Sequence, residues 1–342
     1  MILLAKYKIF IFLPNDVLVG YYCRGTFFLY KETPLSGAFL CVHARGGERM
    51  MTAINLIDAR EYDFTLDKLR GFFRAKGFIE APVQHRRSIM AACEDPRTVT
   101  EFTHGGESWP MPQTGQMWLE WELLSNPSVP GYYCVSTSFR NEPDPIPGRH
   151  DLIFPMFEFE THGNMDTLLA LEVELVTYLG IGYNSCFKFF RHADYAETAE
   201  ALGVKEITAE HEDRMWREWG HNVLFLKHFP MYTSPFWNMK KVGDVANKID
   251  VILYGMETIG SAERSTDPDE MRHLFHTISS GMYADMLYAK FGKHRVEERL
   301  ENFLALPMFP RCGGGIGMTR MIRALKYAGV LQPSPVRDPI EL

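Results

Sequence analysis

The sequence predicts an α+β fold in which an antiparallel β-sheet is flanked by helices. Helical and extended patterns mix along the 342 residues without the regular strand–helix alternation that builds a doubly wound parallel sheet. Internal repeats and low-complexity tracts are absent from the sequence. Apolar residues make up 46% and charged residues 23% of the chain, which is typical of globular domains and excludes a disordered, collagen-like or coiled-coil protein.

The first clear element is an amphipathic helix over residues 64–76. Its apolar residues recur at helical spacing, and Gly77 ends it. Residues 77–82 then indicate a turn into a short strand. Residues 135–139 and 154–160 indicate two further strands, which flank a loop rich in proline and glycine.

The second half of the chain is rich in helical patterns. They cover residues 166–179, 193–202, 208–219 and 318–327. Thr208 is a plausible N-cap for the third of these helices. Asp267 followed by Pro268 predicts the start of one more helix, because aspartate caps a helix well and proline suits the first helical position.

Charge and cysteine content indicate a reduced, cytoplasmic protein. The net charge of −7 argues against a broad basic surface for nucleic acids. The apolar residues 9–13 are too few for a membrane span or a convincing signal peptide, so no membrane association is expected. The cysteines are widely spaced without a C-x-x-C pair, which favours free thiols over disulfides or a zinc site. They are Cys23, Cys41, Cys93, Cys134, Cys186 and Cys312.

The first candidate site follows the strand at residues 135–139. Arg140 and Glu142 would share one face, because side chains alternate along a strand. An arginine fork with a nearby acid can hold a phosphate and a neighbouring amine or hydroxyl. After the loop, His150 adds cationic reach, and Phe154 offers a ring on which a planar base can stack. A hairpin with surface salt bridges is the alternative interpretation.

The second candidate site is a glycine-rich run from Gly313 to Gly317 that leads to Arg320. Glycines allow a backbone or a ligand to approach closely, and an arginine at a helix start can meet an anion there. The run is neither a P-loop nor a dinucleotide-binding fingerprint, because the residues that those motifs require do not follow it. Tight packing of a strand is the alternative interpretation.

The third candidate site runs from Glu257 to Arg264. The acid and the arginine are seven residues apart around Gly260-Ser261, and could bind a metal ion and a ligand carboxylate from one strand and turn. An ordinary ion pair is the alternative interpretation.

Taken in order, the three sites resemble the signature motifs of the class II aminoacyl-tRNA synthetases of the asparaginyl and aspartyl subgroup. The Phe-Arg-x-Glu segment with its later Arg-His-x-x-x-Phe resembles the second signature, and Gly-x-Gly-x-Gly-x-x-Arg resembles the third. The resemblance covers about residues 64–325 and extends to the ammonia-using asparagine synthetases that share this core. It implies a single catalytic domain built on the class II antiparallel sheet.

The resemblance implies roles in nucleotide binding for five residues. Arg140 would hold the ATP α-phosphate, and Glu142 would lie beside the nucleotide. His150 would reach the γ-phosphate, while Phe154 and Arg320 would enclose the adenine. Arg140 and Arg320 are thus also the implied catalytic residues, because fixed cations stabilise the charge that develops when a carboxylate attacks the α-phosphate.

The resemblance also implies a metal site and an amino-acid pocket. Glu257 would bind Mg²⁺ that bridges the ATP phosphates, with Ser261 as a second ligand. Gln116, Glu158 and Arg264 would bind the amino acid, with Arg264 gripping its side chain. The aspartyl enzymes place a lysine where this chain has leucine at position 119, and Glu158 matches an asparaginyl glutamate that accepts from the side-chain amide. Both features favour asparagine over aspartate, although Glu158 could equally hold the α-ammonium group.

The domain organisation bears on the acceptor of the activated amino acid. We expect a catalytic domain over residues 61–330, an N-terminal extension over 1–60 and a C-terminal tail over 331–342. Residues 1–50 could form two or three strands that pack on the core, or could precede a later natural start at Met50 or Met51. The tRNA-charging relatives carry an anticodon-binding β-barrel of roughly a hundred residues, and we expect none here.

These expectations combine into three functional hypotheses. The first is ATP-dependent activation of aspartate or asparagine as an aminoacyl-adenylate, passed to an acceptor other than a full tRNA, such as ammonia. The second is an asparaginyl- or aspartyl-tRNA ligase without the usual anticodon domain. The third is a non-catalytic paralogue that binds nucleotide or amino acid. The resemblance also implies an isologous homodimer formed through residues 64–82.

Overall fold

The computed structural model describes residues 7–13, 16–23, 26–31, 57–92, 96–146, 149–182 and 190–332. The chain divides into two units, one with residues 1–54 and 339–342 and the other with residues 55–338. The possible natural starts at Met50 and Met51 and nearly all of the expected C-terminal tail lie outside the described residues.

The smaller unit contains an antiparallel three-stranded sheet. Its strands are β1 (Tyr7–Leu13), β2 (Asp16–Cys23) and β3 (Thr26–Lys31), which pair in chain order. Three strands thus lie within residues 1–50, the number that one of the two alternatives for this segment allowed.

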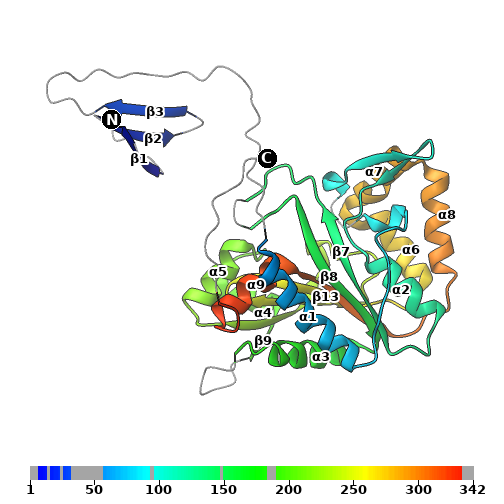
Figure 1. Ribbon diagram of the computed structural model, residues 1–342. Helices are drawn as coiled ribbons and strands as arrows, with labels where there is room; N and C mark the ends of the chain where they lie inside the picture. The colour runs from blue at the N-terminus through cyan, green and yellow to red at the C-terminus, as the bar shows by residue number, and fades with distance from the viewer. Residues whose placement is uncertain are drawn as a thin grey trace. The chain divides into compact units, whose positions relative to one another are not determined.

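A nine-stranded, mostly antiparallel sheet forms the larger unit (Figure 1). Its strands, in spatial order, are β4 (Ile79–Glu80), β7 (Gly131–Phe139), β8 (Ile153–His162), β14 (Arg311–Gly317), β13 (Met256–Glu263), β12 (Val245–Leu253), β10 (Val223–Pro230) and β9 (Phe190–Asp194). The short β11 (Lys241–Val242) pairs with β12. Only the outermost pairs, β4–β7 and β9–β10, are parallel among these neighbours. The predicted α+β class with an antiparallel sheet is confirmed.

Three helices pack on one face of this sheet. They are α1 (Ala59–Ala75), α3 (Met165–Tyr178) and α9 (Met318–Tyr327). Their apolar residues share one core with Phe157 and Phe159 of β8. Since side chains alternate along a strand, the intervening Glu158 points to the opposite face. The central strands therefore have one face in the core and one face free to line a site.

The remaining helices gather at the two ends of the sheet (Figure 1). A group formed by α2 (Gln116–Ser125), α6 (Pro268–Thr277), α7 (Met282–Phe291) and α8 (Lys293–Leu304) shares a second apolar core. The hairpin of β5 (Glu101–His104) and β6 (Glu107–Pro110) lies against α7. At the other end, α4 (Tyr195–Leu202) and α5 (Ala209–Arg217) cover the sheet. The short 3₁₀ helices are η1 (Ile89–Ala91), η2 (Pro96–Thr98), η3 (Met231–Thr233) and η4 (Ile278–Gly281).

The predicted helix ends have the expected physical basis. The Asp267 side chain accepts from the backbone N–H groups of Asp269 and Glu270 at 2.9 and 3.1 Å, which caps α6. Thr208 is the N-cap of α5, as predicted. Gly77 follows α1 with φ of +81°, a left-handed conformation that glycine adopts without strain.

The glycine-rich run is a central strand, β14, and leads directly into α9. A Cβ at Gly313 would stand 2.2 Å from the Phe159 carbonyl oxygen, and one at Gly314 would stand 2.4 Å from the Ser261 Cβ. Both glycines are therefore required for close packing of β14 between β8 and β13. This packing brings the three candidate sites of the sequence side by side, since β8 and β13 carry the other two.

Among the described helices, none combines the length and the apolar character needed to span a lipid bilayer.

Candidate active site

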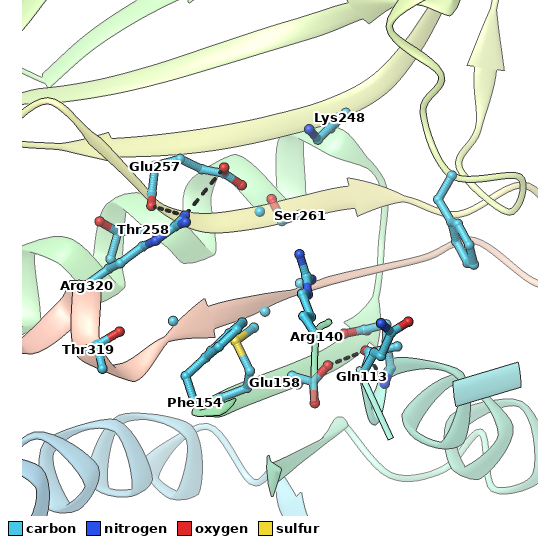
Figure 2. A pocket seen from close by; sticks show the side chains of 18 of the residues that line it. Gln113, Arg140, Phe154, Glu158, Lys248, Glu257, Thr258, Ser261, Thr319 and Arg320 are labelled. Carbon is cyan, nitrogen blue, oxygen red and sulfur yellow. Dashed lines mark hydrogen bonds and ion pairs between the residues drawn. The ribbon is translucent and has the colours of Figure 1, made fainter. Parts of the chain in front are cut away.

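The three candidate sites of the sequence meet around one cavity of about 370 Å³ on the free face of the central strands. All ten residues predicted to act in a site line it. They are Gln116, Arg140, Glu142, His150, Phe154, Glu158, Glu257, Ser261, Arg264 and Arg320. Figure 2 shows Arg320 and Glu257 on one side of the cavity, Glu158 on the other, and Arg140 and Phe154 between them.

Two arginines from distant segments reach the cavity beside Phe154. The Arg140 guanidinium lies 5.7 Å from the centre of the Phe154 ring. Arg320, at the start of α9, donates from Nη1 to the Glu257 carbonyl oxygen at 2.8 Å and lies 3.6 Å from its carboxylate. A planar ring stacked on Phe154 would therefore have cations close by, and phosphate groups would meet fixed positive charge.

His150 lies among these cations and favours its neutral form. Burial lowers its pKa first, and the charges of Arg320, Arg149 and Arg140 lower the pKa further against the opposing charge of Glu142. A neutral imidazole can still donate one hydrogen bond to a phosphate oxygen.

Arg149 is fixed by a residue that the sequence analysis missed. Glu212 of α5 accepts from Arg149 at 2.8 Å and from the backbone N–H of Glu257 at 2.8 Å. Burial and the neighbouring charge of Glu257 raise the pKa of Glu212 despite Arg149. Glu212 thus ties the loop after β7 to the start of β13.

A pair of carboxylates converges above Gly260. A Cβ at this position would stand 3.0 Å from Glu257 Oε1 and 3.6 Å from Asp250 Oδ1. Asp250 lies on β12 directly opposite Gly260, is only 8% exposed, and its Oδ1 has no hydrogen-bond partner in the described part of the chain. Its other oxygen accepts from Lys248 at 3.0 Å. The glycine leaves a cradle in which two carboxylates could hold one cation.

The pKa values of the two carboxyl groups are shifted in opposite directions. Burial, followed by the charge of Glu257, raises the pKa of Asp250 to about 8, although Lys248 acts against it. Burial acts to raise the pKa of Glu257 too, but Lys248, Arg320, Arg149 and Arg140 together hold it below its ordinary value. A divalent cation would favour the charged form of both groups. No group of three or more histidine, cysteine, aspartate or glutamate side chains suited to a metal exists among the described residues. A cation here would need ligands from its substrate.

Ser261 lies along the cavity, but its hydroxyl faces away from the carboxylate pair. It donates to the Ile249 carbonyl oxygen at 3.2 Å, and the residue is 2% exposed. Alternation along β13 places Ser261 on the side of α3 and Gly260 on the side of the cavity. The geometry therefore favours Asp250 over the predicted Ser261 as the partner of Glu257.

Glu172 of α3 lies buried behind this floor. Neither of its carboxyl oxygens has a hydrogen-bond partner among the residues that the structure describes, and the side chain is fully buried. Burial raises its pKa to about 8, an effect that the nearby Ser261 hydroxyl only partly offsets. Glu172 is therefore a neutral acid in the folded protein near pH 7.

The opposite end of the cavity is built on Glu158 of β8. Its carboxylate accepts from the Thr114 and Ser136 hydroxyls and, at 2.8 Å, from the Gly115 backbone N–H. The side chain is 1% exposed, and these neutral donors satisfy it without an opposite charge. Gln116 donates to the Phe159 carbonyl oxygen at 3.0 Å and to the Glu160 carboxylate.

Arg264 belongs to a buried cluster of two arginines and two glutamates. Its Nε and Nη2 donate to Glu160 at 3.3 Å, and Nη2 also donates to the Gly313 carbonyl oxygen at 3.1 Å. Arg311 binds Glu120 at 2.7 and 2.9 Å, and Glu120 lies 3.8 Å from Arg264. The charges of the four side chains cancel when both acids are ionised. The remaining nitrogen of Arg264, Nη1, has no partner in the described part of the chain.

Glu160 is the group in this cluster whose charge can change near neutral pH. Burial raises its pKa to about 7, and the charge of Glu120 acts in the same direction, while Arg264 and Arg311 oppose them. Asn238 completes the cluster by donating to Glu120 at 2.6 Å.

The residues missed by sequence reasoning are those whose partners lie far away in the chain. Glu120 and Arg311, for example, are 191 residues apart. One signal could have revealed Asp250. Two extended runs flank Tyr254 and Gly255. These two residues have positive φ (48° and 74°), as in a tight hairpin turn. Pairing counted out from that turn would have placed Asp250 opposite Ile259, one residue from Gly260. The register shift near Val251 and Ile252 sets it opposite Gly260 itself.

Comparisons with known proteins agree with this architecture. The model of the family "tRNA synthetases class II (D, K and N)" matches residues 59–329, and the chain therefore belongs to this family. Members of this family are ATP-dependent ligases. The resemblance to the asparaginyl and aspartyl subgroup is confirmed, as is the class II core. No curated protein matched the sequence.

Several solved structures share the fold. The asparaginyl-tRNA synthetase from Pyrococcus horikoshii complexed with asparaginyl-adenylate is 14% identical, with a TM-score of 0.62 over 93% of this chain and 89% of that chain. The asparaginyl-tRNA synthetase of Entamoeba histolytica is 18% identical, with a TM-score of 0.60 over 79% of this chain and 64% of that one. The aspartyl tRNA synthetase of the same organism is 18% identical, with a TM-score of 0.57 over 79% and 55%. The matched part thus spans less than two thirds of both Entamoeba enzymes.

Proposed function

We propose that the protein activates asparagine with ATP, forming asparaginyl-adenylate and pyrophosphate, and that aspartate is its second substrate. The observation that carries the proposal is the meeting of ten residues from three separated sequence motifs around one cavity. The cations and the carboxylate pair at one end of the cavity suit a nucleotide, and the buried charge cluster at the other end suits an amino acid.

The nucleotide end of the cavity supports the reaction through fixed charge. In this proposal Arg140 binds the α-phosphate, Glu142 lies beside the nucleotide and His150 meets the γ-phosphate. Phe154 and Arg320 enclose the adenine. Attack of the amino-acid carboxylate on the α-phosphorus increases negative charge there. The guanidinium groups of Arg149, held by Glu212, and Arg320, held by Glu257, stabilise this charge without reorganising.

Mg²⁺ fits the carboxylate pair of Asp250 and Glu257. The cradle above Gly260 and the unpaired Asp250 Oδ1 suit a hard cation that prefers oxygen ligands. Mg²⁺ usually takes only one or two protein carboxylates and completes its shell with water and substrate phosphates. When bound, it would neutralise phosphate charge and act as a Lewis acid.

The partners of Arg264 support an amide over a carboxylate as the substrate side chain. A carboxylate is best bound by two parallel N–H groups of one guanidinium. Here Nε and Nη2 are occupied by Glu160 and Gly313, so Arg264 offers Nη1 alone. The two N–H groups of this one nitrogen diverge, so they suit the single oxygen of a carboxamide better than the paired oxygens of a carboxylate. The nearby Glu160 carboxylate could accept from the NH₂ group of the carboxamide. The leucine at position 119 adds no cation that would help to hold an acid.

Aspartate is the second candidate because Glu160 can be neutralised. When Glu160 is protonated, the cluster carries one positive charge, and a substrate carboxylate can replace the lost negative charge. With ammonia as the acceptor, we propose that aspartate binds with its α-carboxylate at Arg264 and that its side-chain carboxylate attacks the α-phosphorus and releases pyrophosphate. Ammonia then attacks the β-aspartyl-adenylate, and asparagine and AMP are the products. Transfer to a tRNA is the alternative acceptor reaction.

We also propose a homodimer formed through residues 64–82. The edge strand β4 lies in this segment, and Ile79 is 50% exposed on it. An exposed apolar side chain on a sheet edge suits an isologous contact. The molecular mass in solution, compared between the wild type and Ile79→Asp, tests this.

The test of the activity is ATP–pyrophosphate exchange with each of the twenty amino acids. The proposal expects exchange with asparagine, weaker exchange with aspartate, and none with lysine. Addition of ammonia or bulk tRNA then identifies the acceptor. Free asparagine made from aspartate supports ammonia, and acid-precipitable aminoacyl-tRNA supports transfer to RNA.

A further inference from the structure

A second cavity of about 370 Å³ lies beside the active cavity and is lined by cations. The segment after the β5–β6 hairpin separates the two, since Met111 and Pro112 line the second cavity, whereas Gln113 and Thr114 line the first. Two arginines and two histidines face the second cavity, and none of the described residues that line it is acidic. They are His85, Arg86, Arg87 and His104. This is unexpected in a chain of net charge −7.

The guanidinium of Arg87 has no counter-ion among the described residues. Arg87 is exposed, no described carboxylate contacts it, and its guanidinium lies 5.0 Å from the centre of the Trp109 ring. Arg86, by contrast, pairs with Glu122 at 2.5 Å. His85 and His104 have no hydrogen-bond partner in the described part of the chain. The cavity therefore presents donors that the fold itself does not use.

The nearby acids are directed elsewhere. Glu101 pairs with Lys290 at 2.7 Å, and Glu107 pairs with Arg295 at 3.5 Å. Neither acid is among the residues that line the cavity. The hairpin thus turns its carboxylates toward α7 and α8.

A buried tryptophan holds Arg87 in place. Trp109 is 5% exposed, and the guanidinium groups of Arg87, Arg295 and Arg299 lie 5.0, 4.5 and 5.9 Å from its ring centre. Stacking on a fixed ring restricts the Arg87 side chain before a ligand arrives, which lowers the entropic cost of binding.

We propose that this second cavity binds the phosphate group of a small molecule, at a site separate from that for ATP. A guanidinium with free N–H groups matches a phosphate, and two imidazoles can supply further donors. Phe102 and Phe139 also line the cavity and offer apolar surface to the rest of the ligand. Because Phe139 lines this cavity and directly precedes Arg140, a bound ligand would contact the strand end next to the active-site arginine.

The test is isothermal titration calorimetry, with inorganic phosphate titrated into the full chain. The active cavity is first saturated with an ATP analogue whose α–β bridge is a methylene group, so that phosphate cannot bind there. The proposal expects one phosphate site per chain, with at least tenfold weaker binding in Arg87→Gln and in His104→Gln. Arg299→Gln is the matched control, because Arg299 contacts the same tryptophan without lining the cavity, and its affinity should equal that of the wild type.

Two results would overturn the proposal. One is the absence of phosphate binding to the wild type, and the other is equal affinity in the wild type and Arg87→Gln. Far-UV circular dichroism of each variant excludes unfolding as the cause of a loss. Failure of the ATP analogue to bind would count against the proposed function alone, since the phosphate site would still be identified by its loss in Arg87→Gln and its retention in Arg140→Gln.

Discussion

The guanidinium of Arg264 is bound to the carboxylate of Glu160, with Nε and Nη2 each 3.3 Å from it, although Arg264 is only 4% exposed and Glu160 is fully buried. A buried ion pair is costly to form and still more costly to break, because one charge is then left without a partner. The pair is therefore a fixed feature of the amino-acid end of the cavity. It sets how many donors remain for a substrate.

Replacement of Arg264 is expected to abolish use of the amino acid while sparing ATP binding. The double variant Arg264→Gln/Glu160→Gln removes both charges, which avoids an unpaired buried carboxylate. We expect it to fold, to bind ATP with less than about threefold change, and to lose at least about 100-fold in amino-acid-dependent pyrophosphate exchange. Arg217→Gln, at an exposed ion pair with Asp213, is the control. Exchange at the wild-type rate in the double variant would refute the pocket assignment.

Selectivity between asparagine and aspartate is expected to depend on pH through Glu160. Its pKa is raised to about 7, so its protonated fraction falls from about nine tenths at pH 6 to about one tenth at pH 8. The ratio of aspartate to asparagine exchange should fall about 100-fold over this range, because protonated Glu160 favours aspartate and the Glu160 carboxylate favours asparagine. Glu160→Gln, which is permanently neutral, should keep the ratio high and independent of pH. A ratio that does not change with pH in the wild type would rule out this role of Glu160.

The demand for Mg²⁺ is expected to distinguish Asp250 from Ser261. Asp250→Asn and Glu257→Gln should each raise the Mg²⁺ concentration for half-maximal exchange about tenfold or more, because each removes a charged ligand. Ser261→Ala should change it less than about twofold, because the hydroxyl is bound to the Ile249 carbonyl. An effect of Ser261→Ala as large as that of Asp250→Asn would restore the prediction made from the sequence.

Stability is expected to fall as pH rises because of Glu172. Its pKa is about 8 in the folded state against an ordinary value of 4.5, so the folded state binds the extra proton between these values. The contribution of this proton is complete below about pH 4.5 and is lost as pH rises to about 8, with a slope near 1.4 kcal/mol per pH unit. Urea unfolding of Glu172→Gln between pH 5 and pH 8.5 should show a smaller loss than the wild type. Parallel curves would mean that Glu172 does not carry this dependence.

Much of the site could be predicted from the sequence because each motif lies within one short segment. Arg140 and Phe154 flank one loop, and Glu257 and Arg264 lie on and just after one strand. Their spacing is set by local backbone geometry, so the pattern alone indicated what each segment could bind. The tight packing predicted as an alternative for the glycine run also proved correct, since Gly313 has no room for a side chain.

The remainder depends on contacts that no local pattern specifies. Glu120, on α2, meets Arg311 only because β14 lies between β8 and β13. The face of Ser261 depends on a register shift between β12 and β13 near Val251 and Ile252, which the sequence does not reveal. The second cavity could not be predicted from the sequence because its cations come from two separate segments. The β5–β6 hairpin, which brings His104 and Trp109 to the other segment, has no clear pattern in the sequence.

ATP–pyrophosphate exchange measures directly whether this cavity forms an aminoacyl-adenylate. We expect exchange that requires Mg²⁺, is fastest with asparagine, is detectable with aspartate, and is lost in Arg140→Gln. Absence of exchange with all twenty amino acids, from a folded protein that binds ATP, would contradict it.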